Sequence, residues 1–499
     1  MPAGVLLATS TVLIGWVALL PVRERIGMLG YHLSAVPVGV LGWTFVAAVS
    51  MALRAGWSPV LVTTSLLAWC GLVWMAVRLL VGPIDVRTML APGAWWTYLL
   101  WFVVIVGFSA YFVRLGVSAF SADGWSQYEP DGIILNEIGR TSPRALGNRM
   151  VTVSAIHAAY HFFGGEFTHA IQPVLGLVTA LLVGAGVWWA TAGRMGTVSR
   201  VAVSLAPMLL MPTNAVYAFH SVYLHSHMVS AMFLILSVVA LMRAAEGAAR
   251  ERDTLEPAWL LLAGLGTAGI VLARPDGAAY AVVPILVAAA LLVRLRAAGR
   301  YADAYFAPLL GASALVIAGG VIQHGMWWTR KLSLQTLILF LAVYGVAWVL
   351  ARVLSSGDRL GWLMSGTNAL RLAVAADMLA LIAVWRFWSE TVMRSLENMV
   401  SNLLSTGGYR TFWPFAAGMI GISLSLRPKS TRHIFTAYAL FAVVQFMVIA
   451  FVLHGIRHPG RIGWGDSFNR VSFQIVPVIY LYIGLYLGEL AEALRPRTR

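Results

Sequence analysis

The fold follows from the stretch Trp95-Trp-Thr-Tyr-Leu-Leu-Trp-Phe-Val-Val-Ile-Val-Gly-Phe-Ser-Ala-Tyr-Phe-Val-Arg-Leu-Gly116. It is followed closely by a second stretch, Phe120-Ser-Ala-Asp-Gly-Trp-Ser-Gln-Tyr-Glu-Pro-Asp-Gly132. The first run is almost entirely apolar and is long enough to cross a bilayer, which takes roughly 20 such residues. The second run holds three carboxylates and two aromatic side chains among glycines and a proline, which interrupt regular structure. We therefore predict a membrane-spanning helix that ends in an acidic and aromatic loop.

The composition of the whole chain is that of a membrane protein. Of its 499 residues, 60% are hydrophobic and only 11% are charged, and the mean hydropathy is +0.79. No soluble domain has that balance, so we predict an all-α fold, a polytopic bundle of transmembrane helices. The net charge of +15 comes almost entirely from arginine. Because these arginines are scattered rather than gathered in a basic domain, nucleic acid is not an expected partner.

Apolar runs of spanning length recur along the chain, and we expect about 13–15 membrane crossings. Between the late runs, Ser389 to Arg410 is expected to form an amphipathic helix on the membrane surface, ending at Gly407-Gly408. The expected spans lie near 3–21, 29–53, 57–82, 95–116, 168–192, 200–216, 226–243, 258–273, 277–294, 304–323, 333–353, 371–388, 412–426, 433–453 and 471–490.

The short basic loops give the orientation, because cytoplasmic loops favour arginine and lysine. The basic segments are 194–200, 243–252, 294–300, 427–432 and the tail 495–499, and alternation of the spans places all of them on one side. That side is expected to face the cytoplasm, with the protein in the plasma (inner) membrane. The extracytoplasmic side then receives 117–167, 217–225, 274–276, 324–332, 389–411 and 454–470, which carry most of the histidines and several arginines.

The acidic loop is the first candidate site. A carboxylate at a membrane face, partly desolvated by Trp125 and Tyr128, can act as a general base for a hydroxyl group. Asp123 follows the preceding helix most closely, so its position is the best fixed. Glu129 and Asp131 can position an acceptor or bind a divalent cation, which oxygen ligands at alternate positions suit. The other interpretation is that these charges only solvate the loop.

Histidines crowd the segment Asn214-Ala-Val-Tyr-Ala-Phe-His-Ser-Val-Tyr-Leu-His-Ser-His227. Histidine is costly to expose to lipid, so His220, His225 and His227 should face protein or a wet cavity, together with Tyr223. An ordinary hydrogen-bonding role and contact with substrate both remain open. A metal site is the weakest alternative, since no third ligand is evident nearby.

The stretch Ala273-Arg-Pro-Asp-Gly277 is expected to form a tight turn between two spans. Arg274 and Asp276 either pair within that turn or contact a substrate, with Arg274 near a phosphate. A pairing of Arg274 with Asp276 that only holds the turn is the simpler interpretation.

The last expected outer loop combines several glycines with arginines, histidines and Asp466. Glycine-rich backbone with arginine side chains is suited to binding phosphate, and Arg461 and Arg470 are the candidates for that contact. Snorkelling of Arg470 to lipid headgroups is the alternative.

This pattern resembles the GT-C superfamily of bacterial membrane glycosyltransferases, which use polyprenyl-phosphate-linked sugars. The resemblance covers roughly 95–490 and rests on short motifs. In this family a catalytic acidic residue lies in the first large outer loop, just after a transmembrane helix. The stretches that look like family motifs are Ser121-Ala-Asp-Gly-Trp-Ser-Gln-Tyr-Glu129, Gly147-Asn-Arg-Met150, Ala170-Ile-Gln-Pro-Val174, Ala273-Arg-Pro-Asp-Gly277 and Ser467-Phe-Asn-Arg470 before Pro477.

The resemblance implies a fold and a reaction. Residues 1–94 would be N-terminal transmembrane helices, and 95–499 a GT-C-like catalytic region that includes the outer loop 117–167. Asp123 would be the base that deprotonates the acceptor hydroxyl, which attacks the anomeric carbon with inversion. Arg274 or Arg470 would stabilise the phosphate leaving group. The partners implied are a polyprenyl-phosphate sugar, a glycan, lipid or protein acceptor, and membrane lipid.

Two other classes of function stay open at this point. A transporter or lipid flippase would place ionisable residues deep within the spans, and Asp377 and Arg78 are the clearest of the few present. A polymerase or ligase of the O-antigen type would share the lipid carrier, but its main catalytic loop would lie late in the chain. No cofactor is certain from the sequence, and a divalent cation is an alternative only.

Overall fold

The computed structural model describes residues 3–84, 95–115, 128–141, 150–165, 171–222, 225–249, 255–274, 276–294, 299–324, 334–354, 366–426, 434–455 and 467–494. All regular secondary structure in these ranges is helical. The all-α class is therefore confirmed for the described part of the chain.

Eight helical stretches in the described residues are long and apolar enough to cross a membrane, which makes this a multi-pass helical bundle. A bent pair of helices, Thr197–Thr213 and Ala215–Val222, would add a ninth. Four shorter apolar helices accompany them, and the higher total of 13–15 crossings stays a prediction. The eight stretches are Ala3–Leu53, Pro59–Val81, Trp95–Arg114, Ile171–Ala190, Ser226–Glu246, Gly299–Gln323, Phe435–Leu453 and Arg470–Ala493.

The first of these stretches folds back on itself as two antiparallel helices, α1 (Ala3–Leu19) and α2 (Arg23–Leu53). The chain leaves helical geometry at Gly27, whose φ is 70°. Along the interface a Cβ on Gly15 would lie 1.8 Å from the Ala35 carbonyl oxygen, and the two backbones therefore touch. Small residues allow this close approach, which gives tight packing in a lipid environment.

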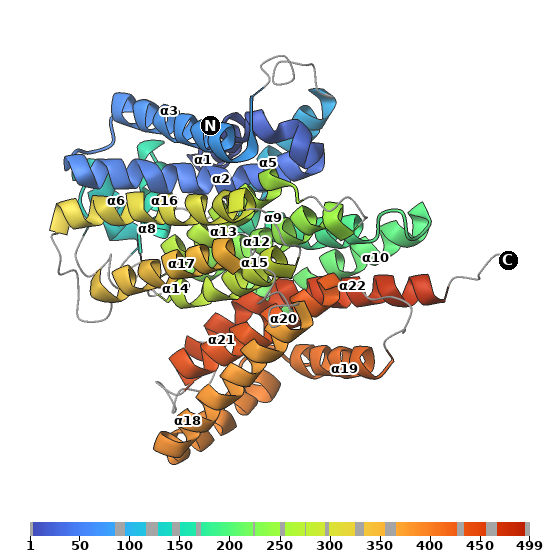
Figure 1. Ribbon diagram of the computed structural model, residues 1–499. Coiled ribbons are helices and arrows are strands. Elements are labelled where there is room, and N and C mark those ends of the chain that lie inside the picture. Colours follow the sequence, from blue (N-terminus) through green and yellow to red (C-terminus); the bar gives the residue numbers. More distant parts are fainter. Residues whose placement is uncertain are drawn as a thin grey trace.

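The centre of the bundle is formed by α9 (Ile171–Ala190), α12 (Ser226–Ala249), α13 (Pro257–Ala273) and α16 (Gly299–His324). In the apolar part of α12, 94% of the residues are buried inside the protein. A helix that is apolar on all sides belongs in such a position. Figure 1 shows α1, α2 and α3 (Pro59–Ala76) along one side of this centre and α22 (Val476–Ala493) along the other, with α18 (Gly366–Ser401) and α19 (Phe412–Ser425) projecting beyond it.

Two short helices, α6 (Glu129–Ile138) and α8 (Val151–Phe162), cover one end of the bundle, at the left of Figure 1. They pack so closely that a Cβ on Gly132 would lie 2.4 Å from the Cβ of His157. Thr152 Oγ1 donates a hydrogen bond to the carbonyl oxygen of Leu272 at 2.8 Å, which fastens α8 to α13.

The prediction of a loop over 120–132 is therefore wrong for its last four residues, because α6 begins at Glu129. Pro130 lies in the first turn of this helix, where a backbone donor has no partner within the helix and the fixed φ of proline is favourable. Gly132 serves the close contact with α8 rather than a break in the chain.

The late predicted span and the predicted surface helix both lie in α18 (Gly366–Ser401). The predicted span 371–388 and the predicted surface helix from Ser389 are two helices that meet at a kink at Trp388, where φ is −140°. The helix continues as a π-helical turn, η5 (Asn402–Thr406), and ends before Gly408, whose φ is 79°. The break at Trp388 and the end at the glycines lie where the sequence places the start and the end of the second helix, and its position on the membrane surface stays a prediction.

The remaining helices complete the bundle. They are α3 (Pro59–Ala76) with the π-helical turn η2 (Val77–Val81), α5 (Trp95–Leu115), α10 (Thr197–Leu210), α11 (Ala215–Val222), α14 (Gly277–Tyr280), α15 (Val282–Arg294), α17 (Leu334–Leu354), α19 (Phe412–Ser425), α20 (Ile434–Ala450) and α21 (Ser467–Ser472).

The two ends of the bundle differ in chemistry. At one end α9 meets α10 and α12, and the Arg200 guanidinium lies 3.5 Å from the Trp188 ring centre and that of Arg243 5.1 Å from Trp189. We call this the basic end. At the opposite end, α6 and α8 lie beside the start of α12 and the end of α13, and we call it the polar end.

Candidate functional site

The polar end holds a cluster of ionisable and polar side chains from six parts of the chain. The cluster is assembled by α6 and α8, by the bent α10–α11 pair, by the start of α12, by the turn after α13 and by the start of the last span. We call it the polar cluster, and its members are Tyr128, Glu129, Asp131, His157, His161, His220, His225, Ser226, His227, Arg274, Asp276, Arg470 and Gln474.

Glu129 lies between two histidines of α8. Its carboxylate oxygens are 2.6 Å from His157 Nδ1 and 2.7 Å from His161 Nε2. The two histidines are four positions apart, so they project from the same face of the helix. Glu129 is only 6% exposed, and this contact satisfies a carboxylate that would otherwise be buried at high cost.

The environment of Glu129 changes its acidity. Burial raises the pKa of the carboxyl group, but the hydrogen-bonding groups and the positive charge of His157 and His161 outweigh it and lower the pKa to about 2. A carboxylate with so low a pKa is a weak base near neutral pH. Glu129 is therefore better suited to holding α6 against α8 than to removing a proton.

Asp131 is buried in the first turn of α6, with 6% of its surface exposed. Negative charge is favourable at this end of a helix, because the backbone N–H groups of the first turn point toward it.

Arg274 follows directly after α13 and is held by several partners. Its Nε and Nη2 donate to the two carboxylate oxygens of Asp276 at 2.7 and 2.9 Å. Its Nη1 lies 3.2 Å from Ser226 Oγ and 2.9 Å from the ring of His227. Arginine can only donate, so the His227 ring nitrogen facing it accepts. The predicted pairing of Arg274 with Asp276 is confirmed.

Tyr128 joins the acidic side of the cluster to the side with the arginines. Its hydroxyl donates to Ser226 Oγ at 3.2 Å, and its ring stacks on that of His157 with 6.4 Å between the centroids. The same ring meets the edge of His225 at 5.8 Å. The residue that precedes Glu129 is thereby anchored to the start of α12.

The histidines of α11 and of the start of α12, with His225 just before it, form a stack. The rings of His225 and His227 lie parallel with centroids 4.2 Å apart, and His220 meets His227 at 5.6 Å. Arg470 Nη1 lies 3.4 Å from His225 Nε2, and Gln474 Nε2 lies 3.2 Å from His227 Nδ1. All three histidines are buried in protein, as expected from the cost of exposing them to lipid.

The structure thus brings together most of the predicted site residues that it describes, from parts of the chain far apart in sequence. Five other predicted site residues lie outside the described residues: Asp123, Trp125, Tyr223, Arg461 and Asp466.

Four members of the cluster were not identified from the sequence: His157, His161, Ser226 and Gln474. The spacing His157-Ala-Ala-Tyr-His161 was the available signal, because two histidines four apart share a helix face. The contact with Glu129 could not be foreseen, since it depends on the packing of α6 on α8.

The described residues contain no group of three histidine, cysteine, aspartate or glutamate side chains arranged to hold a metal ion. The divalent cation considered from the sequence stays a prediction.

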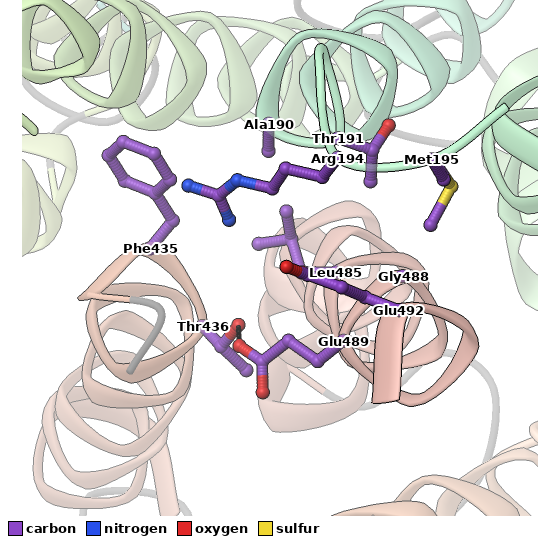
Figure 2. Close-up of a pocket in the computed structure, with 10 residues that line it drawn as sticks. All are labelled: Ala190, Thr191, Arg194, Met195, Phe435, Thr436, Leu485, Gly488, Glu489 and Glu492. Carbon is purple, nitrogen blue, oxygen red and sulfur yellow. Dashed lines mark hydrogen bonds between the residues drawn. The ribbon is translucent and has the colours of Figure 1, made fainter. Parts of the chain in front are cut away.

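A small cavity at the basic end contrasts with the polar cluster (Figure 2). Its volume is about 10 Å³, which is room for about one water molecule. Figure 2 shows Arg194 extending across the cavity toward Phe435, while the Glu489 carboxylate lies beside Thr436, which donates to it. A sugar or a phosphate does not fit here, so this cavity is not the substrate site.

Comparison of the chain with protein-family models, with curated proteins and with solved structures finds no match.

Proposed function

We propose that the protein is an integral-membrane glycosyltransferase of the GT-C type. In this proposal it moves a sugar from a polyprenyl-phosphate donor to a hydroxyl group of a glycan, lipid or protein acceptor on the extracytoplasmic face. The observation that carries the proposal is the polar cluster, in which carboxylates, arginines and histidines meet at the end of the bundle opposite the basic loops.

The chemistry of the cluster suits a phosphate leaving group. A departing polyprenyl phosphate carries negative charge, which arginine and histidine donors stabilise. Three donors of Arg274 point to Asp276 or Ser226, and its side chain is 12% exposed. Arg470 stands at the start of the last span, with its Nη1 3.4 Å from His225 Nε2. We therefore assign the phosphate contact first to Arg470, with Arg274 as the residue that holds Ser226 and His227 in place.

The general base in this proposal is Asp123. The low pKa of Glu129 makes that residue a poor base, so its proposed role is to position α6. Asp131 is the second choice for the base. The acceptor hydroxyl loses its proton to the aspartate, its oxygen bonds to the anomeric carbon, and the bond to the phosphate oxygen breaks on the opposite face.

The test is transfer from a panel of radiolabelled polyprenyl-phosphate sugars by the purified protein in nanodiscs. Asp123→Asn should abolish transfer while donor binding survives, and Asp303→Asn at the basic end is the matched control. Asp303 accepts a hydrogen bond from Trp348 Nε1 at 2.9 Å, which asparagine can still accept. Transfer that survives Asp123→Asn but not Asp131→Asn would move the base to Asp131. An inactive parent protein across the whole panel would overturn the proposal.

A membrane transporter is the second candidate, and one observation favours it. Helices α10 and α11 form an apolar pair bent by 73° at Asn214, and His220 of α11 lies in the polar cluster. Broken helices with ionisable residues at the break are common in transporters. Flux of a lipid or solute into proteoliposomes, without sugar transfer, would favour the transporter function.

A further inference from the structure

A groove on the lipid-facing side of the bundle has no part in the polar cluster. It has a volume of about 240 Å³ and lies between α3 with η2 on one side and α13 with α16 on the other. This is below the roughly 300–1,000 Å³ of pockets that hold drug-sized ligands. All of its lining side chains are apolar except for the indole of Trp69, and they include Met75, Leu79, Leu265 and Leu315.

The shape of the groove follows from small residues on its floor. The floor is the surface of α16 around Ala307, Gly311 and Ala312. A Cβ built on Gly311 meets no atom within 4 Å, so the space above it is open. Beneath this floor α13 and α16 are in backbone contact, since a Cβ on Gly264 would lie 2.1 Å from the Tyr305 carbonyl oxygen. The α13–α16 side of the groove is therefore fixed in shape by backbone contact.

The length of the groove matches one leaflet of a bilayer. From Trp69 to Leu80 the wall rises about 16 Å, and from Ala307 to Leu315 the floor rises about 12 Å, at 1.5 Å per helical residue. Half of a hydrocarbon core of about 30 Å is about 15 Å. A single hydrocarbon chain of one leaflet fits this length, whereas a lipid spanning both leaflets does not.

The groove runs toward the basic end of the bundle. Leu79 and Leu80, at that end of the groove, belong to η2, where Arg25 Nη1 donates to the Val81 carbonyl oxygen at 3.1 Å. Arg78 is exposed on the same turn. Glu256 interacts electrostatically with Arg25 and offsets part of its charge, and Arg78 adds a further positive charge on η2.

We propose that this groove is a binding site for one acyl chain of an anionic phospholipid in the leaflet at the basic end, with its phosphate headgroup beside Arg78 and Arg25. Basic side chains at the end of an apolar groove between transmembrane helices are the arrangement that anionic headgroups favour. The site is separate from the polar cluster, and the proposal does not depend on the sugar-transfer activity.

The chain-binding part is tested by native mass spectrometry of the detergent-purified protein titrated with phosphatidylglycerol. Gly311→Phe places a ring in the groove, and we expect binding to weaken about fivefold as the chain loses its contacts. Gly421→Phe is the matched control, because Gly421 is an exposed glycine of α19 with open space at its Cβ. Equal binding by Gly311→Phe and the parent, or equal losses in both variants, would overturn the proposal.

The headgroup part is tested by comparing phosphatidylglycerol with phosphatidylcholine on the same protein. One arginine near a bilayer surface favours an anionic lipid by about fivefold, so Arg78→Gln should lower the preference by that factor. Arg394→Gln, which removes an exposed arginine of α18, should leave the preference unchanged. A parent protein without any preference for phosphatidylglycerol would overturn the assignment of an anionic lipid.

Discussion

At the scale of single residues, the polar cluster depends on side chains that serve two neighbours at once. Glu129 holds two histidines, and Ser226 Oγ lies at hydrogen-bond distance from both Tyr128 and Arg274. Removing one such group leaves buried polar atoms without a hydrogen bond, and the free-energy cost of that exceeds the stabilisation that the bond contributes.

The ion pair of Glu129 predicts a pH-dependent stability. The pKa of Glu129 is about 2 in the folded protein, compared with an ordinary value of 4.5. A lowered folded-state pKa stabilises the protein above pH 4.5, and this contribution is lost as the pH falls toward 2. At neutral pH this difference in pKa corresponds to at most about 3 kcal/mol of stabilisation of the folded protein. Glu129→Gln should therefore melt below the parent at pH 7, with the gap closing between pH 4.5 and 2.

Thermal unfolding in detergent, followed by tryptophan fluorescence across that pH range, measures this gap. Glu137→Gln is the matched control, because Glu137 is an exposed carboxylate on the same helix. A gap for Glu129→Gln that stays constant down to pH 2 would assign the stabilisation to something other than the charge of Glu129.

At the scale of elements, the cluster is positioned by close helix contacts and by one helix break. Helix α6 lies on α8 through Gly132, and α11 starts anew at Asn214 after α10 has ended. The sequence predicted the end of the span before the acidic loop and the turn at Arg274, because both follow from apolar runs and turn residues. It could not predict α6, since Pro130 and Gly132 have roles that depend on position within a helix and on a neighbour.

The contact at Gly132 predicts a large effect for a small substitution. Gly132→Ala puts a methyl group 2.4 Å from the Cβ of His157, so α6 must move away from α8. We expect a loss of about 1–3 kcal/mol in stability, as for overpacking elsewhere. Gly71→Ala in α3 is the control, because its Cβ meets nothing within 4 Å and alanine favours helix. Equal melting temperatures for Gly132→Ala and the parent would contradict the contact.

The cap at the start of α11 predicts that Asn214 contributes to the stability of the protein. Asn214 Oδ1 accepts hydrogen bonds from the backbone N–H groups of Val216 and Tyr217 at 3.0 and 3.2 Å, which caps the helix. Asn214→Ala should cost about 1 kcal/mol, whereas Asn214→Asp keeps an acceptor and should cost less. Denaturant unfolding of the two variants in detergent distinguishes them. If aspartate fails to restore stability over alanine, the cap is not what Asn214 contributes.

At the scale of the whole molecule, the bundle separates a polar end from a basic end. The sequence predicted this separation correctly in outline, because histidines and carboxylates alternate with arginine-rich loops between apolar runs. The pairing of Glu129 with His157 and His161 was beyond the sequence, since helices that are distant in an apolar chain give no signal of which polar residues will meet. The assignment of each end to one side of the membrane rests on the excess of arginine in the basic loops.

The orientation is tested by labelling intact cells with a membrane-impermeant maleimide. The single native cysteine, Cys70, is buried. Glu137→Cys at the polar end should react from outside, whereas Ser199→Cys at the basic end should react only after the cells are lysed; both positions are exposed. The reverse labelling pattern would mean that the protein has the opposite orientation, with the polar cluster facing the cytoplasm.

The break after α10 has a consequence for the bilayer itself. With 14 residues, α10 rises about 21 Å, and the 3-10 turn Met211–Thr213 adds about 6 Å before the bend at Asn214, so the straight segment is slightly shorter than a hydrocarbon core of about 30 Å. Its outward side chains, such as Val198 and Leu209, are apolar and face lipid. This hydrophobic mismatch is relieved when the membrane thins beside α10. A thinner membrane at this face would shorten the distance that the headgroup of a lipid-linked substrate must cover to reach His220.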